Sequence, residues 1–308
     1  MTSPDRPSGA QWTIRHDDHE VVVVEVGGGL RTYTHHGVPV VSGYGPDEQA
    51  GAGRGQLLMP WPNRVRDGRF SFHGHDLQLA LTEPARGNAI HGLVRWDLWA
   101  LEEQSDSAVT LSCRLLPQQG WVWSLDLRVT YALGDDGLTV TPWARNVGEG
   151  PAPFGFGAHP YLTVGEDRVD EVELQVPART WLETDAERLL PVARHEVAEG
   201  RDDFRRARAV GGVELDTAFT DLQPDGDGRC RVVLRHPGTG RTASLWVDAA
   251  YRWLQVFTGD SLSADQRRTS GIAVEPMTCP PDALSTGDDL VTLDPGQEWS
   301  GSWGITPR

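Results

Sequence analysis

The stretch FGFGAHPYL, residues 154–162, places one titratable side chain, His159, between glycines and aromatics on one side and a proline on the other. Glycines inside a strand-like segment indicate close approach by a ligand or by another backbone segment. His91, in NAIHGLV, is also flanked by apolar residues. An imidazole titrates near about pH 6.5 and can give or take a proton. Both histidines are therefore candidates for acid–base chemistry, although a hydrogen-bonded core histidine is the commoner reading of such a setting.

A carboxylate, Glu275, ends the apolar run GIAV and precedes Pro276, which favours an extended conformation for the residue before it. Burying an unpaired carboxylate is costly, so Glu275 is either salt-bridged or functional. Two other polar residues, Asp216 in GGVELDTAF and Gln255 in WLQVFTG, lie on strand-like segments. All three are candidate site residues.

Asn63 and Arg64 follow the rigid segment Pro60-Trp61-Pro62. Proline restricts the backbone, so an arginine placed after it can present a fixed fork of hydrogen-bond donors. The alternative is a surface loop with a salt-bridged arginine, and the stretch alone favours neither.

The elements that must position these residues are β-strands. The chain has 35 glycines and 21 prolines, which leave little room for long helices, and apolar residues between these breaks alternate with a period of two. Residues 125–133 alternate in this way, and Asp136-Gly137 then precedes a second alternating run, which predicts a β-hairpin. Residues 109–115, 172–176 and 230–234 show the same pattern.

Many short half-buried strands predict an all-β fold of large antiparallel sheets, folded over each other or closed. No change of composition marks a boundary, so we expect one domain over residues 1–308 with a flexible tail at residues 1–10. The only helix we expect is a short turn at residues 201–210. The glycines at 27–29 are followed by another strand-like run and not by a helix, which argues against a phosphate-binding loop.

The charge balance is 28 basic against 44 acidic residues, a net charge of −16. This argues against nucleic acid or an anionic membrane as partner and favours a small neutral molecule. The sequence shows no membrane helix and no secretory signal, which predicts a cytoplasmic location. The three cysteines predict neither a disulfide framework nor a metal site, and the paired histidines lack a third ligand at a zinc-like spacing.

Six segments, PWPNRVRDGRFSFHG, NAIHGLVR, HPYL, ELDTAF, LQVFTG and AVEPMTCPPDAL, occur in the order and approximate spacing of the aldose 1-epimerase (mutarotase) family. The resemblance extends from about Val21 to Trp303. It implies a large antiparallel β-sandwich, called a supersandwich, with a sugar site on a concave sheet. It also implies a cofactor-independent isomerase that interconverts the anomers of an aldose such as glucose or galactose.

Position by position, the resemblance implies a catalytic glutamate at Glu275 and a catalytic histidine at His159, with His91 as the second histidine. The sugar-binding residues that it implies are Asn63, Arg64, Asp216 and Gln255. A hexose-6-phosphate epimerase of the same fold, which should have extra basic residues at the site, and a non-catalytic carbohydrate-binding protein are the alternatives. The natural sugar and the choice between monomer and homodimer stay open.

Overall fold

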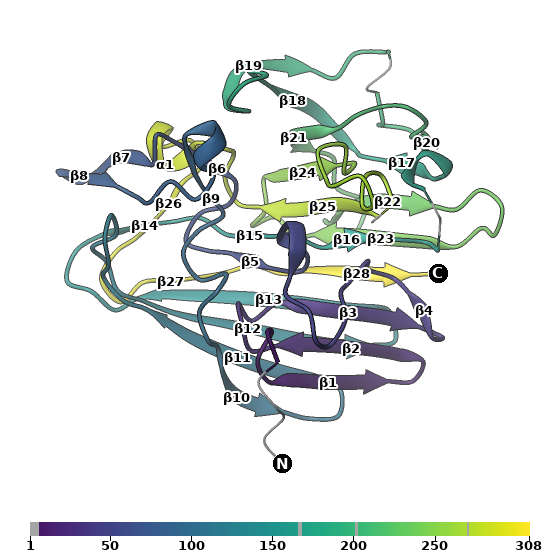
Figure 1. Ribbon diagram of the computed structural model, residues 1–308, viewed down its shortest axis with the longest axis horizontal. Helices are drawn as coiled ribbons and strands as arrows, with labels where there is room; N and C mark the ends of the chain where they lie inside the picture. Colours follow the sequence, from purple (N-terminus) through teal and green to yellow (C-terminus); the bar gives the residue numbers. More distant parts are fainter. Residues whose placement is uncertain (1–5, 166–167, 201–202, 270) are drawn as a thin grey trace.

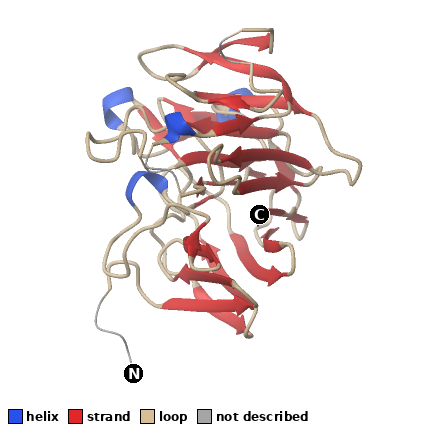
Figure 2. Ribbon diagram, turned by 90° about the vertical axis from the view of Figure 1, so that its right-hand side faces the viewer, coloured by secondary structure: helices blue, strands red, loops and turns tan. Residues whose placement is uncertain are grey.

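The computed structural model describes residues 6–165, 168–200, 203–269 and 271–308. Within these ranges the strands pair antiparallel and form two large sheets and four smaller ones (Figure 1). Helical structure is confined to short turns beside the strands (Figure 2). The predicted all-β antiparallel fold is confirmed.

The eight-stranded sheet carries most of the candidate residues. Its order is β19-β18-β21-β24-β25-β15-β5, and β16 also pairs with β25. In Figure 1 this sheet extends from β19 at the top to β5 near the middle. Its strands are β5 (Leu57–Leu58), β15 (Gly157–Ala158), β16 (Tyr161–Leu162), β18 (Ala178–Thr184), β19 (Pro191–Glu196), β21 (Asp216–Leu222), β24 (Trp253–Phe257) and β25 (Ile272–Met277).

The ten-stranded sheet has the order β10-β11-β12-β13-β28-β23-β22-β17-β20, with β27 also paired to β13. Its strands are β10 (Ala100–Gln104), β11 (Ala108–Leu115), β12 (Leu125–Gly134), β13 (Gly137–Asn146), β17 (Glu173–Gln175), β20 (Arg208–Ala209), β22 (Cys230–Arg235), β23 (Thr242–Val247), β27 (Glu298–Ser300) and β28 (Trp303–Pro307).

Smaller units complete the fold. A four-stranded sheet contains β1 (Gln11–His16), β2 (His19–Val24), β3 (Leu30–His35) and β4 (Val38–Pro39). The two-stranded ribbons pair β6 (Arg64–Arg66) with β9 (Asn88–Ile90), β7 (Arg69–Phe72) with β8 (His75–Gln78), and β14 (Ala152–Phe154) with β26 (Val291–Leu293). The helical turns are α1 (Ala283–Thr286), η1 (Gly51–Gly53), η2 (Pro84–Arg86) and η3 (Val169–Glu171).

The two large sheets share one apolar core. Leu254 and Val256 of β24 belong to the same buried cluster as Leu127 of β12 and Leu245 of β23. Side chains alternate between the two faces of a strand, so the neighbours of Leu254 and Val256 point away from this core. The face of the eight-stranded sheet opposite the core is therefore where Trp253 and Gln255 lie.

The predicted hairpin at residues 125–140 is present as β12 and β13, with Gly134 paired to Gly137. Gly137 has a positive φ of 112°, whereas the two turn residues before it have negative φ. A glycine immediately after the turn accommodates this conformation without the steric cost of a Cβ atom.

The predicted helical turn at residues 201–210 is wrong for residues 203–210, and residues 201–202 lie outside the described residues. Here the chain bends and then forms β20, because Phe204 is buried and its carbonyl accepts a hydrogen bond from the Val176 N–H at 2.7 Å. The exposed side chain of Arg205 donates hydrogen bonds to both carboxylate oxygens of Asp203. The one α-helix among the described residues is α1, whose four residues are too few to leave a periodic signal.

The predicted tail differs from the structure at residues 6–10. Ser8 is buried, and its carbonyl accepts a hydrogen bond from the Val26 N–H at 3.1 Å, so this segment lies against the body of the protein. Residues 1–5 lie outside the described residues. No helix in the described part of the chain is long and apolar enough to cross a membrane.

Candidate active site

Three candidate residues lie on one face of three adjacent strands. Gln255 on β24 pairs directly with Glu275 on β25, and it pairs on its other side with Ala218 of β21. Asp216 is two residues before Ala218 and therefore points to the same face. The Gln255 side-chain Nε2 donates a hydrogen bond to Asp216 Oδ1 at 2.6 Å.

This face becomes apolar farther along the same strands. Leu182, Ala218, Trp253 and Met277 form a small buried cluster separate from the main core. The site is therefore a polar patch at one end of an otherwise apolar surface, and such a surface excludes water and strengthens electrostatic interactions between groups beside it.

His159 joins this group from the break between β15 and β16, both of which pair with β25. Its Nε2 atom is 3.4 Å from Oε1 of Glu275, and the two side chains are only 7% and 3% exposed. This distance is longer than the roughly 2.7–3.2 Å of a hydrogen bond, so the two groups face each other without being tied together.

Several contacts hold the His159 ring. It stacks on Tyr161 with centroids 5.1 Å apart, and it meets the His91 ring edge to face at 5.5 Å. Gly53 packs against its edge, since a Cβ atom there would be 2.7 Å from His159 Cδ2. The ring is thus aimed by packing from separate segments, in addition to the restriction that Pro160 places on the backbone.

His91 and Asn63 lie at the same end of the β6–β9 ribbon. Each has positive φ, 64° and 54°, and the His91 N–H donates to the Asn63 carbonyl at 2.9 Å. The Asn63 N–H in turn donates to Nδ1 of His91 at 3.2 Å. Burial, foremost, and the neighbouring His159 hold the pKa of His91 well below its usual range. The ring is therefore neutral, with its hydrogen on Nε2 as a donor.

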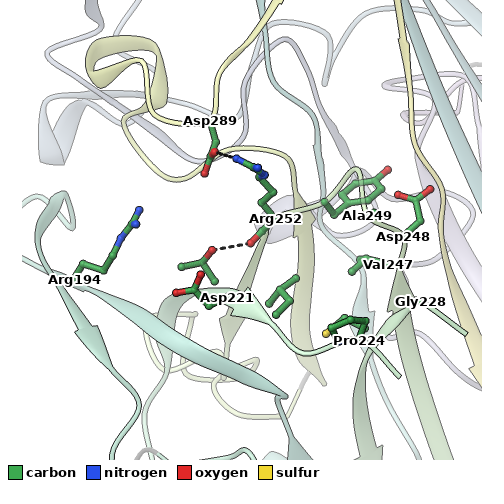
Figure 3. A pocket seen from close by; sticks show the side chains of 13 residues that line it. Arg194, Asp221, Pro224, Gly228, Val247, Asp248, Ala249, Arg252 and Asp289 are labelled. Carbon is green, nitrogen blue, oxygen red and sulfur yellow. Dashed lines mark hydrogen bonds and ion pairs between the residues drawn. The ribbon is translucent and has the colours of Figure 1, made fainter. Parts of the chain in front are cut away.

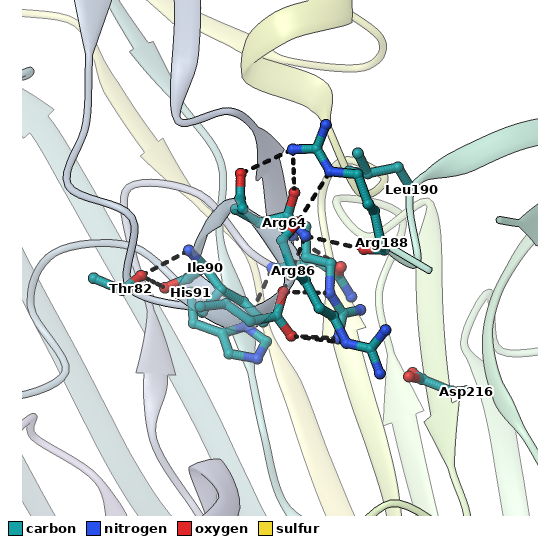
Figure 4. Close-up of polar contacts among 12 residues, drawn as sticks. Arg64, Thr82, Arg86, Ile90, His91, Arg188, Leu190 and Asp216 are labelled. Carbon is teal, nitrogen blue, oxygen red and sulfur yellow. Dashed lines mark hydrogen bonds and ion pairs between the residues drawn. The ribbon is translucent and has the colours of Figure 1, made fainter. Parts of the chain in front are cut away.

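Arg64 is both ion-paired and part of the site. Its Nε and Nη2 donate to the two carboxylate oxygens of Glu83 at 2.9 and 3.0 Å, and its side chain is 11% exposed. Figure 4 shows Asp216 near the guanidinium, without a direct bond between them. Burial opposes the charge on Arg64, but the Glu83 hydrogen bonds and the Asp216 charge raise its pKa overall.

Electrostatics favour the neutral forms of the central pair. Burial, foremost, and the nearby Asp216 charge raise the pKa of Glu275 well above its usual range, although the Arg64 charge opposes this. Burial also lowers the pKa of His159 to about 3, with Arg95 and Arg54 contributing in the same direction. The pKa of His159 thus departs from the unperturbed imidazole value near 6.5, because the ring is completely buried and the sequence does not reveal this.

Three site side chains have a buried polar atom with no hydrogen-bond partner among the described residues: His159 Nδ1, Gln255 Oε1 and Glu275 Oε2. Buried polar atoms are nearly always paired, because leaving one unpaired costs about 1–3 kcal/mol. Three such atoms on neighbouring side chains leave donors and acceptors free to bind a polar ligand.

All seven residues singled out from the sequence thus meet around one part of the eight-stranded sheet. Glu83, Tyr161 and Gly53 are additional members of the site that were not singled out from the sequence. Tyr161 was visible in HPYL, two residues after His159, but nothing local marks Glu83 as the partner of Arg64.

A separate pocket of about 470 Å³ lies at the far ends of β21 and β24 (Figure 3). None of the seven candidate residues lines it, and two of its charged residues, Arg252 and Asp289, pair with each other. Among the described residues, one group of side chains could share a metal ion, namely His16, Asp17 and Asp135. It is on a partly exposed surface of other strands and is explained by the ion pair between His16 and Asp135.

Comparisons with known proteins agree with this fold. The chain matches the aldose 1-epimerase family model over residues 10–306, so it belongs to the aldose 1-epimerase family. It is 35% identical over 291 residues to YihR, an uncharacterized protein of Escherichia coli, covering 94% of this chain and 91% of that protein.

Solved structures show the same fold at lower identity. A GalM/aldose epimerase homologue from C. elegans is 18% identical, with a TM-score of 0.86 over 97% of this chain and 99% of that one. Galactose 1-epimerase from Lactobacillus acidophilus NCFM is 20% identical, with a TM-score of 0.79 over 97% and 94% of the two chains. Family membership supports an epimerase-type enzyme acting on a small aldose sugar.

Proposed function

We propose that the protein interconverts the α and β anomers of a free aldose such as glucose or galactose, with Glu275 and His159 as its acid–base pair. The observation that carries this proposal is the approach of the carboxyl and imidazole groups to 3.4 Å in a buried setting. Interconversion requires one proton to leave the anomeric hydroxyl while another reaches the ring oxygen. Two titratable groups side by side supply both transfers.

In the forward direction Glu275 takes the proton of the anomeric hydroxyl, and His159 delivers a proton to the ring oxygen as the bond between that oxygen and the anomeric carbon breaks. The anomeric carbon becomes an aldehyde and rotates about its bond to the next carbon. The ring hydroxyl then attacks the other face of the aldehyde, its proton returns to His159, and Glu275 returns a proton to the new anomeric hydroxyl. No step requires a metal ion or a redox cofactor.

The pair must hold one proton in total for this scheme to begin. The low pKa of His159 and the raised pKa of Glu275 favour that single-proton state, with the proton on the carboxyl in the free site. The charged form, with the proton on the imidazole, contains the same number of protons. The reaction therefore needs a proton to move within the site, not exchange with solvent.

The remaining candidates hold the sugar. Arg64, Asp216 and Gln255 provide donors and acceptors for its hydroxyl groups, with Asn63 beside Arg64. His91, neutral and with its hydrogen on Nε2, donates to the ring oxygen and stabilises the charge that develops there.

Polarimetry tests the function directly. Fresh α-glucose or α-galactose should reach its equilibrium optical rotation faster with the protein than without it. A sugar labelled with deuterium at the anomeric carbon should keep the label, because ring opening breaks the bond to oxygen and leaves the bond to deuterium intact. Unchanged rotation kinetics with a panel of aldoses would contradict the function, and loss of the label to water would contradict the mechanism.

The pH dependence should be broad. Two ordinary side chains in these roles would make kcat/KM fall below about pH 4.3 and above about pH 6.5. Because the pKa of His159 is about 3 and that of Glu275 is raised, the single-proton state extends in both directions. We expect the acidic limb of kcat/KM to lie near about pH 3, where His159 gains a proton, and the alkaline limb to shift upward with the raised pKa of Glu275. An acidic limb of kcat/KM that stays near about pH 4.3, as two ordinary side chains would give, would contradict the low pKa of His159.

A hexose 6-phosphate is a second candidate substrate, favoured by two arginines beside the site. Arg54 is 6% exposed and lies over the Tyr161 ring at 4.8 Å, while Arg95 contacts Gln56 and the Ile90 carbonyl. Both charges depress the pKa of His159. Within the described ranges neither has a carboxylate partner, although buried arginines are normally paired with one. A phosphate group on the sugar would supply the missing anion.

Glucose 6-phosphate compared with glucose decides between the candidates. If the phosphate binds these arginines, the protein should anomerise glucose 6-phosphate with a KM about tenfold or more below that of glucose, and Arg54→Ala should remove the difference. Equal KM values for the two sugars in the wild-type protein would exclude this candidate and leave the free aldose.

A further inference from the structure

The tip of the β18–β19 hairpin is a tightly bonded turn. Both carboxylate oxygens of Asp185 accept backbone hydrogen bonds, Oδ1 from the Arg188 N–H at 2.6 Å and Oδ2 from the Leu190 N–H at 3.0 Å. Leu189, between these two residues, has a positive φ of 54°. The turn therefore presents the Arg188 side chain from a constrained backbone.

Arg188 reaches from this tip to the loop that contains η2. Its Nε donates to the Arg86 carbonyl at 2.9 Å, and its Nη2 donates to the Gly87 carbonyl at 2.8 Å and to Asn88 Oδ1 at 3.2 Å (Figure 4). Nη2 also contacts Asp67 Oδ1 at 2.8 Å. One guanidinium thus fixes three successive residues of the loop, which only a planar fork of donors can do.

Asn88 in this loop bonds back to Arg188 and also connects the loop to the candidate active site. Asn88 is fully buried, and its Nδ2 donates to the Arg188 carbonyl at 2.9 Å and to Glu83 Oε2 at 3.0 Å. Glu83 in turn accepts both hydrogen bonds from Arg64. A continuous series of hydrogen bonds therefore runs from the hairpin tip through Arg188, Asn88 and Glu83 to Arg64.

We propose that Arg188 is a positioning residue that sets the direction of the Arg64 guanidinium, and through it the affinity for the sugar. This inference rests on the proposed function, in which Arg64 holds sugar hydroxyl groups. Glu83 has an alternative partner, because Nε of Arg86 lies 3.6 Å from its Oε1. Arg188 holds the Arg86 carbonyl and Asn88 and so keeps Glu83 turned toward Arg64.

Arg188→Ala should therefore raise KM about tenfold and leave kcat within about twofold, because binding is lost equally from the ground state and the transition state. The control is Arg179→Ala, which removes the same charge from an exposed position of β18. Arg188→Lys should recover only part of the loss, because an ammonium group cannot bond three loop acceptors in one plane. A KM for Arg188→Ala equal to that of Arg179→Ala would overturn the proposal.

A double-mutant cycle separates positioning from a direct role. If Arg188 acts through Arg64, then Arg188→Ala should not raise KM further when Arg64 is already alanine. If the increase in KM of the double variant equalled the product of the increases in the two single variants, the proposal would be overturned.

A spectroscopic measurement keeps the test independent of activity. The Arg64 Nε–H, bonded to Glu83, should give a resolved NMR signal that is assigned by its loss in Arg64→Lys. Arg188→Ala should shift or broaden this signal, and Arg179→Ala should leave it in place. A signal that Arg188→Ala leaves unchanged would overturn the positioning role, whereas a wild-type protein inactive on every aldose would contradict the proposed function alone.

Discussion

Glu275→Gln is expected to abolish the acceleration of mutarotation while the protein stays folded. Gln has the same shape as Glu but cannot take the proton of the anomeric hydroxyl. Removing a positioned general base costs about 10²- to 10⁴-fold in rate. The sugar should still bind, because the hydroxyl contacts of Arg64 and Asp216 do not depend on the charge of Glu275.

The same substitution should also raise the unfolding temperature at neutral pH. The pKa of Glu275 is higher in the folded protein than in the unfolded chain, because the carboxyl is buried beside Asp216. The contribution of this group to stability is therefore greatest below about pH 4.3 and is lost as the pH rises toward the folded-state pKa. Gln does not ionise, so the stability of the variant does not decrease in this way as the pH rises.

Polarimetry and thermal unfolding of the same samples measure both effects. Glu103→Gln, an equivalent change on the exposed strand β10, is the matched control and should alter neither property. A Glu275→Gln variant that keeps full activity would remove this residue from the mechanism. An unfolding temperature that drops below that of the wild type would show that the carboxylate is charged and paired in the folded state.

Several candidate residues could be singled out from the sequence because they lie on strand-like segments, whereas their roles came only from the resemblance to the family. Glu275 ends the apolar run GIAV and Gln255 lies among apolar residues in WLQVF, and antiparallel pairing of two such strands brings the two polar side chains face to face. His159 was predictable for a related reason, since the glycines of FGFGAHPYL mark the point where the chain leaves β15 and packs closely on other segments.

The supporting contacts could not be predicted in this way. Glu83 lies 19 residues from Arg64, and Arg188 lies 100 residues from Asn88, in segments without a periodic pattern. Their partners are fixed by the path of loops across the sheet, and short-range patterning carries no information about that path. The pKa of His159 could not be predicted from the sequence either. It depends on the burial of the ring by Tyr161, Gly53 and His91, which come from three separate segments.

His159→Gln is the second substitution with a large expected effect, and its comparison with His91→Asn separates two roles. If His159 delivers the proton to the ring oxygen, its loss should lower kcat about 10²- to 10⁴-fold, with little change in KM. Burial, foremost, and the neighbouring His159 hold the pKa of His91 low, so its ring is neutral. Because Nδ1 accepts the Asn63 N–H, only Nε2 is left to face the sugar, as a donor. Its replacement should cost less, about tenfold, the order of one ordinary hydrogen bond.

The choice of asparagine at position 91 follows from the backbone. His91 has a φ of 64°, a conformation that asparagine adopts more readily than glutamine, so the variant tests the imidazole and not the strain of the turn. His159 has no such restriction, and glutamine places a polar atom near the position of Nε2. If His91→Asn proved the slower enzyme and His159→Gln retained most of its rate, the two histidines would exchange roles. His91 would then be the residue that delivers the proton to the ring oxygen of the sugar.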